Sequence, residues 1–224
     1  MSLADFTQLL RDVSIMFAAW AGMYGLDAWR REFRGRREIE LAEESLALFY
    51  EARDAIAAIR SPGGWVGEGM SRKAGEDESA AEKSARDQAF VLMERYARFQ
   101  ELFGKIHARR YRFMAAFGEK AAKPFDDLHG ILNDLFLASR MLATLWTRTR
   151  TGSTPRDETH WAKVEKHESI FWDSGDDDPI NPRLQAAVSN LELTCRAIIQ
   201  GRGTLHGVLN IPIFRRRAPA NQTR

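Results

Sequence analysis

Residues 13–26 contain no charged side chain, and an arginine-rich stretch follows them. An apolar segment near the start of a chain, followed by basic residues, is typical of a membrane anchor whose basic end faces the cytoplasm. We therefore expect residues 1–35 to form an N-terminal membrane-anchor helix with a basic flank. The expected anchor side chains are Val13, Phe17, Trp20, Tyr24, Leu26 and Trp29, and the expected basic residues at the membrane surface are Arg30, Arg31, Arg34, Arg36 and Arg37.

The apolar segment is short for a membrane span, and this leaves other interpretations open. Residues 13–29 would cover roughly 25 Å as a helix, whereas the hydrocarbon core of a bilayer is about 30 Å thick. A segment of this length also suits the membrane interface or the core of a protein. A cleaved signal peptide is disfavoured, because Asp5 and Asp12 oppose Arg11 before the segment and no Ala-x-Ala site follows it.

Composition favours an all-α fold in a reducing compartment. The 224 residues include only seven prolines, and 44% of them are hydrophobic, which is enough for a core. Alternating runs of Val, Ile and Thr, which would indicate strands, are absent. The single cysteine, Cys195, cannot form an intramolecular disulfide. The net charge of +2 makes nucleic acid an unlikely partner.

Apolar side chains at intervals of three and four residues predict a series of long helices. Residues 36–60 form one of them, and no residue except Gly35 interrupts helix before it, so one helix from about residue 5 to residue 60 is expected. A glycine-rich connector over residues 61–75 should follow, with Trp65 packed onto the bundle. Later helices are predicted at residues 76–117, 124–150, 155–172 and 181–200.

These helices predict an antiparallel bundle of four to five long helices, with the N-terminal membrane helix continuing into it. The bundle is expected to comprise residues 36–200 and to lie in the cytoplasm, and residues 201–224 form a C-terminal tail. Apolar seams support the bundle. The seam of the 124–150 helix consists of Leu128, Leu132, Leu135, Ser139, Leu142 and Trp146.

No pattern of residues indicates a catalytic, cofactor or metal site. His160 and His167 are too far apart along one helix to share an ion, and no Glu-x-x-His pair occurs. The acidic residues from Asp173 to Asp178 do not have the spacing of a calcium loop and are expected near the start of the next helix. We therefore expect no cofactor and no metal.

Two arginines, Arg53 and Arg110, fall on otherwise apolar seams. A buried guanidinium needs an acidic partner, because an unpaired buried charge is costly. The candidate partners are Glu94, Asp134 and Glu192. Such a pair either fixes the register of the helices or forms a polar pocket for an anionic ligand, with Arg53, Arg110 and Glu192 as its residues.

These features favour a membrane-anchored, non-enzymatic scaffold or interaction protein. The expected partners are a bilayer with anionic headgroups, a protein of unknown identity, and a second copy of the chain that binds through the anchor or the bundle. The expected location is the inner or plasma membrane, in a single pass with the N-terminus outside. A bundle that senses an anionic small molecule is the alternative, and an enzyme without a sequence-visible motif is a third.

Overall fold

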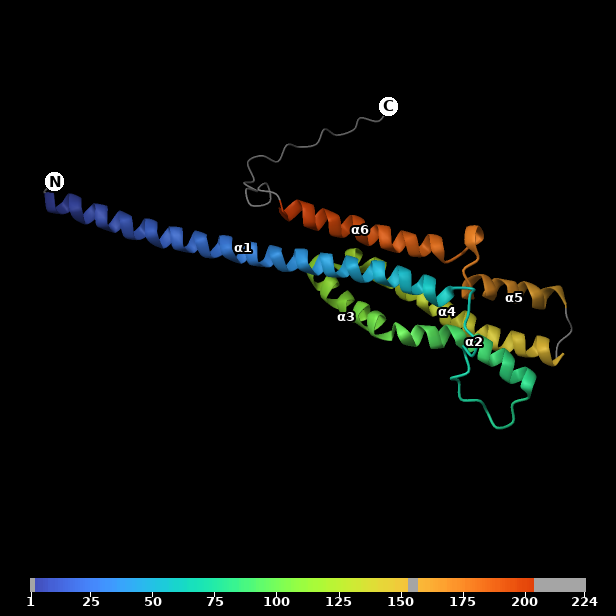
Figure 1. Cartoon of the computed structure of the whole chain (residues 1–224). Helices are drawn as coiled ribbons and strands as arrows, with labels where there is room; N and C mark the ends of the chain where they lie inside the picture. The colour runs from blue at the N-terminus through green and yellow to red at the C-terminus, as the bar shows by residue number, and fades with distance from the viewer. Residues whose placement is uncertain (1–2, 153–156, 204–224) are drawn as a thin grey trace, which may run out of the picture. The chain divides into compact units, whose positions relative to one another are not determined.

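The computed structural model describes residues 3–152 and 157–203, and all regular structure in these residues is helical. The all-α prediction is therefore confirmed. The α-helices, labelled in Figure 1, are α1 (Leu3–Arg60), α2 (Ala80–Arg98), α3 (Gln100–Phe117), α4 (Glu119–Thr151), α5 (Glu158–Phe171) and α6 (Asn181–Gly203). A short 3-10 helix, η1 (Gly175–Asp177), lies between α5 and α6.

The chain divides into two compact units. The first consists of Met1–Ala42 and Ala197–Arg224, and the second is Glu43–Arg196. The expectation of one unbroken helix before the glycine-rich connector is confirmed, because α1 runs from Leu3 to Arg60. No helix among the described residues has a stretch long and apolar enough to cross a bilayer.

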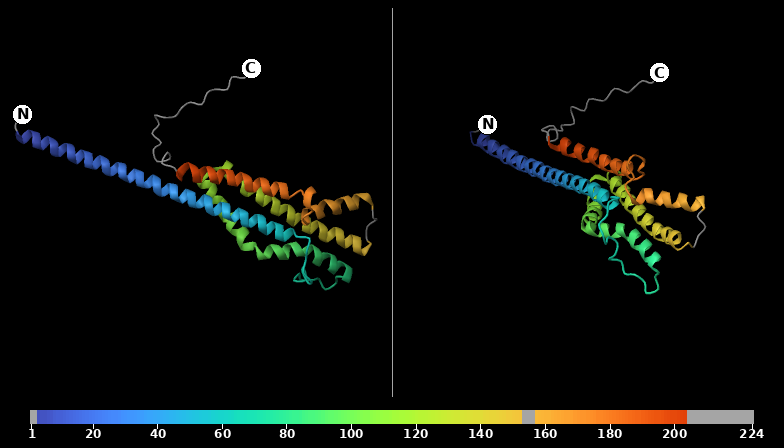
Figure 2. Two further views of the ribbon diagram at one scale, coloured as in Figure 1. Left: turned by 45° about the horizontal axis from the view of Figure 1, so that its top comes forward. Right: turned by 45° about the vertical axis from the view of Figure 1, so that its right-hand side comes forward.

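The second unit is a helical bundle in which α4 packs against α2, α3 and α5. Both views in Figure 2 place α4 beside α2. The α1 part of this unit contacts α4 through Phe49, whose ring meets the Phe125 ring edge-on at 4.9 Å. The predicted seam of α4 is buried at every position, and its serine, Ser139, donates to the carbonyl oxygen of Ala89 at 2.8 Å.

The prediction of one helix over residues 76–117 is wrong, because the chain forms two. The first of the two, α2, starts later than predicted, at Ala80, because Ser79 and Glu82 form a capping box. This helix ends before Phe99, whose backbone leaves the helical conformation with φ −110° and ψ 9°. The break accompanies ring contacts of Tyr96, which stacks on Phe103 at 5.3 Å and meets Phe136 edge-on at 4.8 Å. Tertiary packing of aromatic rings thus accompanies a bend that no glycine or proline marks.

Two other helix starts differ from their predictions. The helix expected from Pro124 begins at Glu119, after Gly118, whose φ of +89° turns the chain. The expected cap at Thr154 and Pro155 lies outside the described residues. Within them, α5 begins after Asp157, whose side chain accepts from the backbone amide of His160.

A buried ion pair joins the ends of α1, α5 and α6. Arg60, the last residue of α1, is 1% exposed, and its guanidinium makes two hydrogen bonds to Asp178, at 2.6 and 2.9 Å. It also donates to the carbonyl oxygens of Ser169, Ile170 and Trp172 at 2.7–2.9 Å. These carbonyls lie at the C-terminal end of α5, where no helical partner is available. Arg60 therefore caps α5.

Asp178 in turn caps α6. Its Oδ1 accepts from the backbone amides of Ile180 and Asn181 at 2.7 and 2.8 Å. The expectation that the acidic loop serves the start of the following helix is confirmed for this residue. The Asp178 carboxylate thus neutralises the buried Arg60 and also caps the N-terminus of α6.

Replacement of Asp178 by Asn should destabilise the protein by about 3 kcal/mol, because Arg60 would remain buried without a counter-charge. The matched control is Asp177→Asn, which alters an exposed neighbouring carboxylate and should change stability by less than about 0.5 kcal/mol. Urea unfolding of the full chain measures both. Equal effects of the two substitutions would contradict the assigned role of Asp178.

Acid should weaken the same ion pair. Burial by itself would raise the pKa of Asp178, but hydrogen bonds from Arg60 and from three backbone amides outweigh it and lower the pKa from 3.8 to about 2. A depressed carboxyl pKa stabilises the fold above the unfolded value, and the contribution, about 2 kcal/mol, is lost as the pH falls from about 5 to about 2. The free energy of unfolding should decline over this range in the wild type, and Asp178→Asn should remove that part of the decline.

Candidate functional site

The connection between α1 and α2, residues 61–79, is held at its base by Arg95 of α2. Its guanidinium forms two hydrogen bonds with the Glu68 carboxylate, at 2.7 and 3.0 Å. It also donates to the carbonyl oxygens of Ile59, Ser61 and Gly63 at 2.5–3.2 Å. Because these carbonyls surround the end of α1, Arg95 caps α1 as Arg60 caps α5. The hydrogen bonds from Arg95 lower the pKa of Glu68, so this carboxylate stays ionised.

Gly69 fixes the middle of the loop against α2. Its backbone amide donates to Glu94 at 2.8 Å, and Ser71 Oγ donates to the same oxygen at 2.9 Å. The φ angle of Gly69 is +84°, and a Cβ at this position would lie 1.9 Å from the carbonyl oxygen of Asp87. The loop therefore approaches the helix at a distance that only glycine permits.

Arg72 fixes the end of the loop between Glu78 and Asp87. Its guanidinium forms ion pairs with both carboxylates, and Lys83 also pairs with Asp87. The hydrogen bond from Arg72 is the main reason that the pKa of Glu78 falls to about 2. Burial opposes the ionisation of Asp87, but Lys83 and Arg72 outweigh it and lower the pKa. Glu68, Glu78 and Asp87 are thus ionised and paired with basic side chains.

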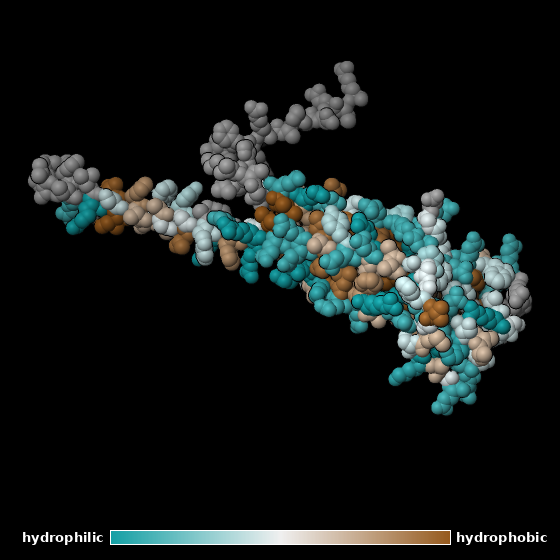
Figure 3. Space-filling view, in the orientation of Figure 1, coloured by the Kyte–Doolittle hydropathy of each residue, from teal (hydrophilic) through white to brown (hydrophobic). Residues whose placement is uncertain are grey.

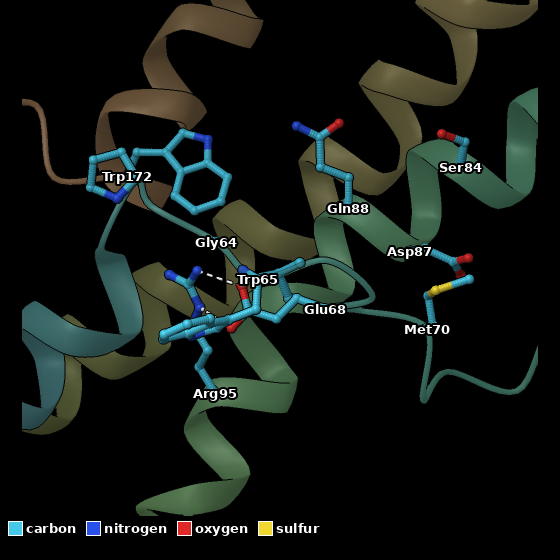
Figure 4. A pocket seen from close by; sticks show the side chains of 11 residues that line it. Gly64, Trp65, Glu68, Met70, Ser84, Asp87, Gln88, Arg95 and Trp172 are labelled. Carbon is cyan, nitrogen blue, oxygen red and sulfur yellow. Dashed lines mark hydrogen bonds and ion pairs between the residues drawn. The ribbon is translucent and has the colours of Figure 1, made fainter.

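A shallow groove of about 490 Å³ lies between this loop, α2 and the end of α5. Figure 4 shows Trp65 beside the Arg95–Glu68 pair and Trp172 further along the groove. The guanidinium of Arg95 lies 5.8 Å from the centre of the Trp172 ring. The prediction that Trp65 packs onto the bundle is wrong, because this side chain is 78% exposed. Val66 and Met70 of the same loop are also exposed.

The ionisable side chains of the groove are held in ion pairs. Its two carboxylates, Glu68 and Asp87, are ionised and form ion pairs with Arg95 and Arg72. In the described part of the chain, no three side chains of His, Cys, Asp or Glu are placed to hold a metal. Burial raises the pKa of the Cys195 thiol to about 12, which makes it a poor nucleophile. The fixed loop base and exposed Trp65 instead favour an interaction surface.

The structure does not bring the predicted polar residues together. Arg53 is not buried, since its side chain is 44% exposed and pairs with the neighbouring Asp54 at 2.9 Å. Arg110 pairs with Asp126, and Glu192 with Arg196. The other two expected partners are used elsewhere, since Glu94 accepts from the loop amide of Gly69 and Asp134 pairs with Arg183.

Among the residues whose side chains are described, the buried arginines are Arg60 and Arg95, and sequence reasoning missed both. Signals for them exist in the sequence. Arg60 stands directly before the Ser-Pro-Gly-Gly stop of a helix, where a basic side chain can serve carbonyl groups. Arg95 lies three residues after the buried Leu92 and four after the buried Val91, which places it on the apolar side of α2.

The first unit offers a second candidate surface on α1. Ten large apolar side chains between residues 13 and 33 are each 51–67% exposed. They are Val13, Ile15, Met16, Phe17, Trp20, Met23, Tyr24, Leu26, Trp29 and Phe33. Brown and tan side chains mark this stretch in Figure 3. Neighbouring aromatic rings pack along the helix. The distances between ring centres are 5.9 Å for Phe17 and Trp20 and 5.7 Å for Trp20 and Tyr24.

The basic residues that follow are exposed as well. Arg30 and Arg34 face solvent, Arg36 pairs with Glu32 at 2.6 Å, and the Arg37 guanidinium lies 5.5 Å from the Phe33 ring centre. The side chain of Arg31 lies outside the described part. An exposed apolar stretch beside exposed arginines is a surface that suits contact with lipid or protein.

Comparison of the chain with protein-family models, with curated proteins and with solved structures finds no match in any of the three. The geometry of the chain therefore carries the functional argument.

Substitution of Gly69 by Ala should release the loop from α2, because the new methyl group would overlap the Asp87 carbonyl. Gly67→Ala is the matched control, since Gly67 also has a positive φ, +93°, but a Cβ there meets nothing closer than 3.7 Å. Both variants carry backbone strain of about 1–3 kcal/mol, and only Gly69→Ala should lose more. Urea unfolding and hydrogen exchange of residues 61–79 measure the difference. Indistinguishable variants would contradict the close approach.

Proposed function

We propose that this chain is a non-enzymatic interaction protein that binds an anionic membrane surface through residues 13–37 and presents its helical bundle to a protein partner. The observation that carries this proposal is the row of large apolar side chains exposed on α1 immediately before a group of arginines. Water is a poor environment for such a row. Burial of each of these side chains contributes about 1.5–3 kcal/mol.

The order of residues along the exposed apolar row of α1, aromatic rings followed by arginines, suits a lipid surface better than water. Trp20, Tyr24 and Trp29 are amphipathic rings of the type that collects at the boundary between headgroups and acyl chains. Arginines that follow can reach phosphate groups while their aliphatic stems stay in contact with the apolar layer. Each basic side chain near an anionic surface adds about 1 kcal/mol.

The helical register supports an orientation along the membrane surface. Met16, Trp20 and Met23 follow one another at intervals of four and three residues, and Arg30, Arg34 and Arg37 continue the same spacing. Met16, Trp20 and Met23 therefore share one side of α1 with these three arginines, and Asp27 lies between the two groups. No described helix meets the length and apolarity needed for a span. We therefore propose that residues 13–29 lie in the interface of the bilayer, on the cytoplasmic leaflet, where anionic lipids gather.

The second unit supports the protein-binding half of the proposal. The exposed Trp65 and Val66 stand on a loop whose base is fixed by Arg95, Gly69 and Arg72. A surface that is already ordered loses little conformational entropy when a partner binds. Tryptophan is also among the side chains that contribute most to protein interfaces.

Lipid binding should depend on the apolar row. We expect the full chain to bind vesicles that contain phosphatidylserine more tightly than vesicles of phosphatidylcholine, and added salt should weaken the difference. Trp20→Glu should reduce binding at least about tenfold, because a carboxylate would enter the apolar layer. Trp65→Glu, the same change at an exposed tryptophan of the second unit, should leave vesicle binding unchanged.

Vesicle co-sedimentation measures both variants. Equal losses of vesicle binding in Trp20→Glu and Trp65→Glu would contradict the assignment of lipid contact to residues 13–37. A wild-type chain that ignores vesicles and instead forms oligomers abolished by Trp20→Glu would overturn the lipid assignment in favour of a second copy of the chain.

A further inference from the structure

A small apolar cavity lies between α3 and α4 in the second unit, away from the Trp65 loop. Its volume is about 150 Å³, and it is more enclosed than the groove beside Trp65. Buried side chains from both helices line it, and His107, Arg110, Asp126 and His129 stand at its polar edge. The apolar walls are Phe103, Ile106, Phe125, Leu128 and Leu132.

The walls give this cavity the character of a binding pocket. Protein interiors are close-packed, and a void of this size leaves its lining without contacts on one side. A cavity of about 150 Å³ between leucine and phenylalanine side chains has room for a group the size of a benzene ring. An apolar body of that size would restore the missing contacts.

Arg110 provides an unfilled binding group at the edge of the cavity. Its Nε donates to Asp126 at 2.6 Å, and its guanidinium lies 5.4 Å from the Tyr111 ring centre. Its two terminal nitrogens donate to no side chain or carbonyl of the described residues. The side chain is 25% exposed and is therefore held in place yet open to a ligand. Two adjacent guanidinium nitrogens match the two oxygens of a carboxylate.

Two imidazoles complete the polar edge. The rings of His107 and His129 lie 6.4 Å apart, one on each helix, and the His107 ring meets Tyr111 edge-on at 5.4 Å. Each imidazole offers at least one N–H donor in either protonation state. Asp126 is the one carboxylate in the lining, and the ion pair with Arg110 neutralises it. The terminal nitrogens of Arg110 and an N–H group of each histidine are therefore the donors left to meet a ligand.

We propose that this cavity binds a small carboxylate with one compact apolar ring, such as an aromatic acid. The ring occupies the space between Phe103, Phe125 and Leu128, and the carboxylate accepts from Arg110, with the two histidines beside it. Apolar walls with a few convergent polar groups are the usual form of a small-molecule site. The site is independent of membrane binding, because all of its residues lie in the second unit.

Benzoate is the probe, and the experiment uses the full chain with isothermal calorimetry. We expect saturable binding of benzoate, weaker binding of benzyl alcohol, which lacks the charge, and no binding of acetate, which lacks the ring. Arg110→Met should weaken benzoate binding by about tenfold or more and leave benzyl alcohol binding unchanged. Arg112→Met, which removes an exposed arginine two residues away, is the matched control and should have no effect.

A second variant tests the cavity. Leu128→Phe should fill the space and abolish binding of both ring compounds, and thermal unfolding checks that the variant is folded. If it does not fold, the paired responses of Arg110→Met and Arg112→Met to benzoate and benzyl alcohol still decide the question. The proposal is overturned if benzoate does not bind saturably, or if Arg110→Met and Arg112→Met weaken it equally. Failure here would leave vesicle binding by residues 13–37 unaffected.

Discussion

The packing of the second unit depends on two buried arginines, each of which caps the C-terminal end of a helix other than its own. Arg60, at the end of α1, donates to three carbonyls at the end of α5, and Arg95 of α2 donates to three carbonyls at the end of α1 and in the loop beyond it. Each guanidinium also forms a two-hydrogen-bond pair with a carboxylate, Asp178 or Glu68. Desolvation of a charge is tolerated only when its hydrogen-bonding groups are satisfied, and both arginines meet that condition. The helix ends and the two charged pairs therefore stabilise one another.

This arrangement explains how a glycine-rich connector can be ordered. Residues 61–79 contain no helix, yet Arg95, Gly69 and Arg72 fix the loop at three points on α2. The apolar side chains Trp65 and Val66 are left outside these attachments. The loop is therefore ordered at its base and exposed at its tip, and a surface that is already ordered loses little conformational entropy on binding. The same attachments engage the carboxylates of Glu68, Glu78 and Asp87 in ion pairs.

The proposed activities use different physical interactions. The N-terminal part of α1 offers apolar and basic groups in sequence, which suit a layered environment such as a lipid headgroup boundary. The α3–α4 cavity offers a partly open apolar space with the Arg110 guanidinium at its edge, which suits a small anion. The Trp65 loop offers an exposed aromatic tip.

The sequence alone predicted the helical class and the buried seam of α4 from the local spacing of apolar residues, and it predicted the continuity of α1 through residue 60 from the lack of helix-breaking residues other than Gly35. It also determined that an apolar row precedes a group of arginines. The break at Phe99 accompanies ring contacts of Tyr96 with Phe103 and Phe136, and no local signal marks it. Which arginines are buried likewise depends on the tertiary structure. Arg53 and Arg110 lie on apolar spacing as much as Arg95 does, but only Arg60 and Arg95 meet the free carbonyls of another helix end and a carboxylate at once. Periodicity reports which side of a helix an arginine occupies, whereas its burial depends on partners that come from distant parts of the chain.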